Sequence, residues 1–210
     1  MGGEEMKKVM VMLLVFVGLF VFSKTIHIKA DFVRPFEEKI EYSGNVFLEI
    51  EEEKFTLKAE SLVVRKLSGK WRITEASSSV TVTLENGEIS GDHLVYDVET
   101  REGTITGNVT GDFLDRSSTE TILVSCDEIV FDLEEDTFIG SGSVQIKKGA
   151  VEASCGKFVY RRGDGIIELA EDVDLNDTEK NLKMKADRVV MDLEADTMEA
   201  SSVAVTLEVE

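Results

Sequence analysis

Few residues in this chain have the chemistry that catalysis needs. Its only histidines are His27 and His93, and its only cysteines are Cys126 and Cys155. A nucleophilic enzyme holds a serine or cysteine beside a base that a third group orients. The sequence supports no Ser/His/Asp or Cys/His arrangement of that kind. We therefore expect no enzymatic activity and no cofactor.

Acidic residues are abundant, but they do not form a ligand pattern. The 42 Asp and Glu residues outnumber the 23 Lys and Arg residues, which gives a net charge of −19 at pH 7. Acid-rich turns such as Glu134-Glu135-Asp136 lack the spacing of a calcium loop, so we interpret them as solvated charge and predict no metal site. A surface this acidic repels phosphodiester backbones, which argues against nucleic acid as a partner.

A pattern that recurs about every 30 residues predicts the elements that carry these side chains. Its first signature is a small residue, then an acid, then an alternating apolar stretch. The copies are Ala30-Asp31, Ala59-Glu60, Gly91-Asp92, Cys126-Asp127, Cys155-Gly156 and Ala186-Asp187. The fifth copy departs from the pattern, because glycine stands at its acid position. A period of this length is typical of repeat architectures.

The second signature is a small or polar pair followed by valine. It is found at Gly44-Asn45-Val46, Ser78-Ser79-Val80, Gly107-Asn108-Val109, Gly142-Ser143-Val144, Glu171-Asp172-Val173 and Ser201-Ser202-Val203. Gly107, Gly140 and Gly142 fall inside strand patterns, where glycine usually marks a bulge or a bend. A long strand that bends at its middle can belong to two facing sheets.

The stretch after each acid alternates as a β-strand does. Large apolar side chains recur two and four residues after the acid. These positions hold Leu62 and Val64, Leu94 and Tyr96, Ile129 and Phe131, Phe158 and Tyr160, and Val189 and Met191. With turn residues between the strands and no helical periodicity after residue 24, the sequence predicts an all-β fold. We expect about a dozen antiparallel strands in two facing sheets, with these side chains between them.

Valine also fills the third position after the acid, which an ordinary one-sided sheet would leave polar. The residues are Val63, Val95, Val130, Val159 and Val190. They form either a surface row of strand-forming residues or a row that faces a second layer, and the sequence leaves both open.

Cys126 and Cys155 occupy the same column of consecutive repeats, which Ala59, Gly91 and Ala186 fill elsewhere. Equivalent positions of an antiparallel meander lie two strands apart, about 9–10 Å. A disulfide needs Cα atoms within about 7 Å. We therefore predict free, buried thiols in a slot for small side chains.

The N-terminal segment predicts export. Residues 9–22 are apolar apart from Gly18 and follow Lys7 and Lys8. Their length suits a signal peptide and falls short of the roughly 20 residues that span a bilayer. We expect cleavage after Ser23, with an uncleaved inner-membrane anchor as the alternative, and one domain over residues 24–210.

The paired signatures resemble those of the OstA-like family of lipopolysaccharide-transport proteins, which includes LptA, LptC and the N-terminal domain of LptD. The best matches are GDHLVYD at 91–97 with GNV at 107–109, and CDEIVFD at 126–132 with GSV at 142–144. The resemblance covers about residues 25–210. It implies a periplasmic β-jellyroll, open at both ends, that holds acyl chains of lipopolysaccharide between its sheets. It also implies a bridge of similar domains that passes the lipid to the outer membrane.

By this resemblance, the large inward side chains are the candidate lipid-binding residues. They are Leu94, Tyr96, Ile129, Phe131, Phe158, Tyr160, Val189 and Met191. The alternative is that these side chains only pack against one another as a core. A lipid partner would be lipopolysaccharide or another envelope lipid. The competing function is a non-catalytic β-solenoid scaffold of the cell envelope, which would pack its interior shut.

The first and last strands predict edge pairing. The last strand alternates well, and the first starts directly after the export segment. Neither carries the proline, bulge or lysine cluster that usually blunts an edge, so both could pair with another chain. The candidate residues are Ile26 and Ile28 at the N-terminal edge and Val205 and Leu207 at the C-terminal edge. The partner would be a second copy or another OstA-like domain, joined head to tail.

Overall fold

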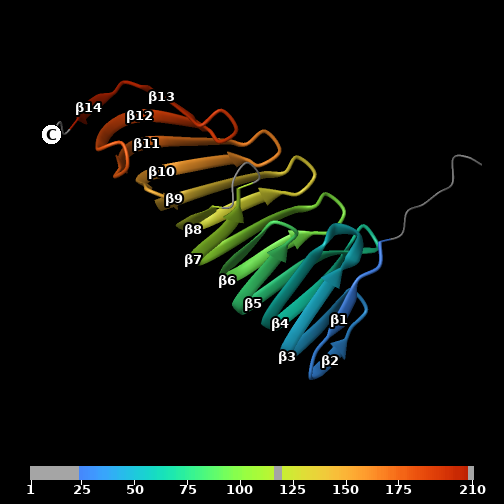
Figure 1. Cartoon of the computed structure of the whole chain (residues 1–210). Coiled ribbons are helices and arrows are strands. Elements are labelled where there is room, and N and C mark those ends of the chain that lie inside the picture. The colour runs from blue at the N-terminus through green and yellow to red at the C-terminus, as the bar shows by residue number, and fades with distance from the viewer. Residues whose placement is uncertain (1–23, 116–119, 208–210) are drawn as a thin grey trace, which may run out of the picture.

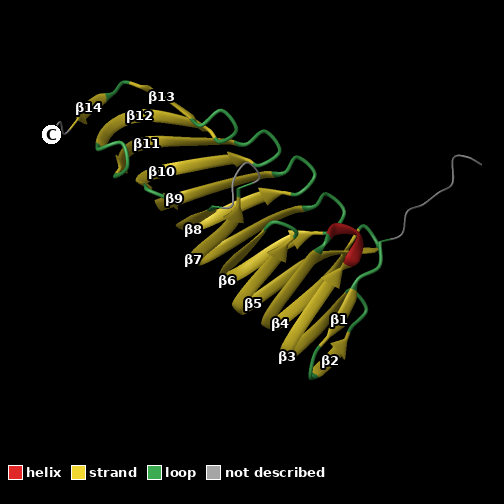
Figure 2. Ribbon diagram, in the orientation of Figure 1, coloured by secondary structure: helices red, strands yellow, loops and turns green. Residues whose placement is uncertain are grey.

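One antiparallel sheet of fourteen strands makes up the fold (Figures 1 and 2). The structure is a computed structural model that describes residues 24–115 and 120–207. The strands are β1 (His27–Lys29), β2 (Phe32–Pro35), β3 (Lys39–Ile50), β4 (Phe55–Leu67), β5 (Lys70–Leu84), β6 (Gly87–Asp97), β7 (Glu102–Leu114), β8 (Thr121–Asp132), β9 (Thr137–Lys148), β10 (Val151–Arg161), β11 (Ile166–Asp177), β12 (Leu182–Asp192), β13 (Thr197–Ser201) and β14 (Ala204–Leu207). Successive strands from β3 to β13 are neighbours, while β1 and β2 both pair with β3, and β13 and β14 both pair with β12. A 3-10 turn, η1 (Glu51–Glu53), connects β3 to β4.

Every second strand from β3 to β11 bends at the polar pair that precedes valine. Both residues of the pair have positive φ, as in Gly107 at 81° and Asn108 at 49°. Asparagine tolerates this left-handed region and glycine adopts it without steric cost. The ladder shifts register at the same place, between Thr106 and Val109 in β7. The bends expected at Gly107 and Gly142 are confirmed.

The acid of the first signature packs against the bend of the next long strand. Asn45 Nδ2 donates a hydrogen bond to Asp31 Oδ2 at 2.8 Å, and Asn108 Nδ2 donates to Asp92 Oδ2 at 2.9 Å. A Cβ atom on Gly107 would lie 2.5 Å from Asp92 Oδ2. Glycine therefore leaves the space that the carboxylate occupies, and the two signatures are the two sides of one contact.

The fifth copy exchanges these two partners. Gly156 stands at the acid position of β10, and Glu171 stands at the glycine position of β11 with φ 69°. A Cβ atom on Gly156 would lie 2.7 Å from Glu171 Oε2, so the glutamate covers the glycine. The departure in this copy thus keeps a contact between one acid and one glycine.

The bends divide the sheet into two facing layers. Layer A contains the strand halves next to the β3–β4, β5–β6, β7–β8, β9–β10 and β11–β12 connections. Layer B contains the strand halves next to the β4–β5, β6–β7, β8–β9, β10–β11 and β12–β13 connections. Phe55 of layer A stacks on Tyr96 of layer B with ring centroids 4.6 Å apart, so the layers are in contact. The predicted all-β fold with two facing layers is confirmed, and both layers belong to one unclosed sheet. Figure 1 shows the strand direction rotating gradually from β3 to β12.

The inward and outward faces follow the alternation of the sequence. The columns two and four residues after the acid are buried from Leu62 to Met191. The valine column lies on the outer face, where Val95 and Val130 are each 39% exposed. Among the described residues no second layer covers this row, so it is a surface row.

The small-residue column is buried, and its two cysteines are free. Each Sγ–H donates to a backbone carbonyl at 3.2 Å, from Cys126 to Glu128 and from Cys155 to Lys157. The predicted free, buried thiols are confirmed. Burial raises the pKa of Cys126 to about 11 and also raises the pKa of Cys155.

The expectation that Gly140 marks a bulge or a bend is wrong. Gly140 lies in regular ladder positions opposite Ile129 and Phe158, with no bulge beside it. The ring of Phe158 occupies the space that a side chain at this position would need. Gly140 therefore makes room for an aromatic ring instead of marking a bend.

The described part of the chain contains no helix long and apolar enough to cross a membrane. The predicted signal peptide or anchor, residues 1–23, lies outside the described residues.

Candidate functional site

Aromatic rings close the interior along the line where the two layers meet, which we call the seam. Phe55 and Phe113 come from layer A, and four rings come from layer B. Neighbouring ring centroids lie 4.6–6.4 Å apart, a range that favours aromatic contacts, along Phe55, Tyr96, Phe131, Phe138, Phe113 and Tyr160. All six rings are buried. The interior between β4 and β10 is therefore filled by side chains.

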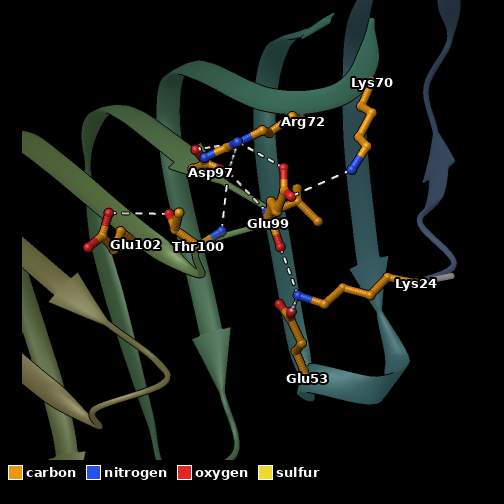
Figure 3. Close-up of polar contacts among 9 residues, drawn as sticks. Lys24, Glu53, Lys70, Arg72, Asp97, Glu99, Thr100 and Glu102 are labelled. Carbon is orange, nitrogen blue, oxygen red and sulfur yellow. Dashed lines mark hydrogen bonds and ion pairs between the residues drawn. The ribbon is translucent and has the colours of Figure 1, made fainter. Parts of the chain in front are cut away.

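Charged residues close the N-terminal part of the seam (Figure 3). Glu53 is 3% exposed, and its Oε1 lies 2.5 Å from Lys24 Nζ and 3.5 Å from Arg101 Nε. Tyr96 Oη donates to Glu53 Oε2 at 2.6 Å. Burial and this neighbouring carboxylate raise the pKa of Tyr96. Glu53 belongs to layer A, whereas Tyr96 and Arg101 belong to layer B. We therefore call the group the seam clamp; its members are Lys24, Glu53, Tyr96 and Arg101.

A second ion-pair group fixes the β6–β7 turn that carries Arg101 (Figure 3). Arg72 Nε donates to Asp97 at 2.7 Å, and Arg72 Nη1 donates to Glu99 Oε2 at 2.8 Å. Asp97 Oδ1 also accepts the backbone N–H groups of Glu99 and Thr100. Burial acts to raise the pKa of Asp97, but the Arg72 and backbone hydrogen bonds outweigh it and hold that pKa below its ordinary value. The turn is thus held in the shape that places Arg101 at the clamp.

The interior opens at the C-terminal end, in a cavity of about 460 Å³ that we call the C-terminal mouth. Its apolar wall comes from Val151 of layer A and from Met191, Leu193 and Met198 around the β12–β13 turn. Met191 takes the column position that Tyr96, Phe131 and Tyr160 hold in earlier copies. No ring contact crosses the seam here among the described residues, because flexible thioether side chains replace the aromatic ones.

Charged side chains surround the C-terminal mouth. They are Glu120, Lys148, Asp177, Glu179, Lys180, Asp192, Glu194 and Asp196. Across residues 24–115 and 120–207, no three His, Cys, Asp or Glu side chains converge to hold a metal ion. The mouth therefore combines an apolar wall with an acidic rim.

The eight predicted lipid-binding side chains all point between the layers and are buried. They join one continuous core, and of the eight only Met191 lines the mouth. In this structure they pack against one another, as the alternative interpretation expected. Their contact with a lipid remains a prediction.

The predicted edge residues lie at opposite ends of the same layer. Ile26 and Ile28 are partly buried against the core, and β1 pairs with Phe47–Glu49 in layer A. β14 also belongs to layer A, with Val205 half-exposed and the Leu207 backbone paired with Leu182. Pro35 lies in β2, on the edge of layer B. The N-terminal edge, expected to be unprotected, is therefore blunted by proline in one layer only.

Sequence reasoning missed the mouth as a distinct site. Met184, Met191 and Met198 fall within one stretch, and the last copy has methionine where three earlier copies have rings. That change of residue type was the available signal. The partners from layer A, such as Val151, lie far away in the chain and follow no repeat spacing.

Comparisons with known proteins find similarity in structure but not in sequence. No protein-family model matches the chain, and no curated protein matches it in sequence. A solved structure described as LptH of Pseudomonas aeruginosa, the LptA-homologous periplasmic component of the lipopolysaccharide transport device, is similar to it at 6% identity and a TM-score of 0.29. The match covers 88% of this chain and 96% of that one. A superposition this poor establishes no shared function, and membership of the OstA-like family stays a resemblance of motifs.

Proposed function

We propose that this chain is an exported, non-catalytic lipid-binding protein that takes an acyl chain through the C-terminal mouth. The observation that carries the proposal is the cavity at the C-terminal end of the seam, where four apolar side chains form a wall inside a charged rim and no ring contact joins the layers among the described residues. Its volume falls within the range of about 300–1,000 Å³ for small-ligand sites. Each methylene removed from water contributes about 0.8 kcal/mol.

The motif resemblance supplies the finer proposal. The lipid would be lipopolysaccharide or another envelope lipid, carried in the periplasm toward the outer membrane. The residues Leu94, Tyr96, Ile129, Phe131, Phe158, Tyr160 and Val189 would contact the chain only if the layers part beyond the mouth. Edge pairing of β14 with β1 of another copy, or of another OstA-like domain, would extend the path.

A second candidate function is an envelope scaffold that binds no lipid. The filled interior from β4 to β10 favours it, because a scaffold has no need of an internal slot. The two functions differ in one property, which is whether the C-terminal mouth takes up an apolar ligand.

The test is native mass spectrometry of the full chain purified from a Gram-negative host. For the carrier we expect co-purified lipid, and we expect the variant Met191→Trp/Met198→Trp to lose it because the added rings fill the mouth. The control Val130→Trp adds a ring to the outer face and should keep the lipid. A wild-type chain that is free of lipid and takes up none when lipopolysaccharide is added would support the scaffold. Phe131→Asp is unsuitable, because Phe131 is buried between Tyr96 and Phe138.

A further inference from the structure

The residues around the C-terminal mouth also indicate which kind of head group its lipid would have. An amphiphile whose chain lies on Met191 and Met198 must leave its head group at the charged rim. We infer that this head group donates hydrogen bonds and has no net negative charge, as a sugar or an amine does and a phosphate does not. The inference rests on the lipid-binding function proposed above. Of the two cargoes named there, it favours another envelope lipid over lipopolysaccharide, whose head group carries phosphates.

The rim is strongly acidic. Among the residues that the structure describes, six carboxylates and two lysines line the mouth, and no arginine does. Phosphate recognition in proteins relies on arginine forks or on cations held ready for the anion. At physiological ionic strength charges interact over about 8 Å, so a head group at the rim experiences this excess of negative charge.

The two lysines are already engaged with carboxylates. Lys148 Nζ lies 3.0 Å from Glu120 and 3.4 Å from Asp115, and Lys180 Nζ lies 3.9 Å from Asp177. A phosphate would have to compete with these carboxylates for each ammonium group. A hydroxyl or ammonium head group needs no such exchange, because it donates to carboxylate oxygens directly.

The acids at the rim have two roles. Asp177 and Asp192 hold the turns, since each Oδ1 accepts two backbone N–H groups, those of Glu179 and Lys180 and those of Glu194 and Ala195. The side chains of Glu179, Glu194 and Asp196 hold no turn by a described hydrogen bond and are exposed. These three define the charge that a head group meets, and they can be changed without removing a turn contact.

The experiment compares amphiphiles that share a twelve-carbon chain. Dodecyl maltoside, dodecylamine and dodecyl phosphate are titrated below their micelle concentrations into the full chain, stripped of lipid, and binding is followed by calorimetry and native mass spectrometry. Each titration is run with EDTA and again with Mg²⁺, which could bridge a phosphate to the acids. We expect dodecyl phosphate to bind at least about tenfold more weakly than the other two in both buffers.

Two charge-reversal double variants test whether the weaker binding of dodecyl phosphate is caused by the acids at the rim. Glu179→Lys/Glu194→Lys should raise the affinity for dodecyl phosphate relative to dodecyl maltoside by about tenfold or more. The control Glu37→Lys/Glu51→Lys makes the same change in net charge at the N-terminal end and should leave that ratio unchanged.

The outcomes separate the inference from the function on which it rests. If no twelve-carbon amphiphile binds, the lipid-binding function fails and the inference fails with it. If all three bind and dodecyl phosphate equals or exceeds the others in either buffer, the function stands and the inference is overturned. Equal effects of the two charge-reversal pairs would also overturn it, because net charge and not the rim would then decide.

Discussion

At four of the five bends, in β3, β7, β9 and β11, one carboxylate and one glycine share a small space. Asp92 faces Gly107 and Asp31 faces Gly44, with an asparagine amide holding the carboxylate. The residue at the glycine position must also adopt positive φ, which costs an ordinary side chain about 1 kcal/mol or more. Both demands fall on the same position, which explains why glycine and serine recur there.

The exchanged fifth copy allows a direct test of this contact. Gly156→Asp alone should lower the free energy of unfolding by about 1–3 kcal/mol, because the new side chain meets Glu171. Adding Glu171→Gly restores the arrangement of the other copies and should recover most of that loss. Urea unfolding of the two single variants and the double variant measures the coupling. Strictly additive losses would show that the two residues do not share the space.

The Cys126 thiol predicts a pH dependence of stability. Its pKa rises from 9.0 to about 11 in the fold because burial disfavours the thiolate. The stability that this adds is complete below pH 9 and is lost as the pH rises toward 11, because the unfolded thiol ionises first. Relative to Cys126→Ala, the wild type should lose about 1 kcal/mol by pH 10 in the free energy of unfolding. Alanine fills this column in other copies, so the variant should fold, and a difference that does not change with pH would contradict the prediction.

At the scale of elements, the seam clamp joins turns that the hydrogen-bond ladder does not connect. Glu53 lies in η1 of layer A, while Tyr96 and Arg101 come from β6 and the β6–β7 turn of layer B. A bent sheet could otherwise open at this side, since its two rows of connections share no ladder. The clamp and the ring stack therefore set the angle between the layers.

Glu53→Ala tests the clamp. It removes the carboxylate partner of Arg101 and Lys24 and the hydrogen-bond acceptor of Tyr96, so we expect a loss of about 2–4 kcal/mol in thermal or urea unfolding. The neighbouring variant Glu51→Ala changes an exposed acid of the same turn and should stay within about 0.5 kcal/mol of the wild type. Equal effects of the two variants would mean that Glu53 does not hold the layers.

At the scale of the whole molecule, both ends of the sheet present unpaired backbone. In layer A the two edges are β1 and β14, which could pair head to tail with other copies. In layer B the N-terminal edge is β2, where Pro35 lacks the N–H that a partner strand would need. Any head-to-tail contact should therefore use layer A.

We expect the variant Val205→Lys to abolish concentration-dependent association in sedimentation velocity. Lysine on an edge strand opposes pairing with another chain. Val130→Lys is the matched control, since it places the same charge on an exposed valine in the middle of the sheet. Association that persists in Val205→Lys, or that Val130→Lys also abolishes, would count against pairing through β14.

The sequence predicted those features that depend on local chemistry. The bends follow from pairs such as Gly107-Asn108, and the inward columns follow from strict alternation, as at Leu94 and Tyr96. The closing of the seam could not be predicted, because Glu53 and Phe55 meet Tyr96 across two intervening turns that no period relates. The mouth depends on Val151 and Met198 in the same way, so it appeared only in three dimensions.

The bend contact has a consequence for how the length of this molecule can change. From β6 to β11, each strand that carries the first signature meets the bent strand after it through one acid and one glycine, so one two-strand unit is built much like the next. Stability in such arrays is a sum of local terms and nearest-neighbour terms. Gain or loss of one whole two-strand unit would keep every junction intact, whereas gain of a single strand would set acid against acid. The lengths open to this architecture are therefore steps of one unit, and the span of the molecule could change through duplication without redesign of its interior.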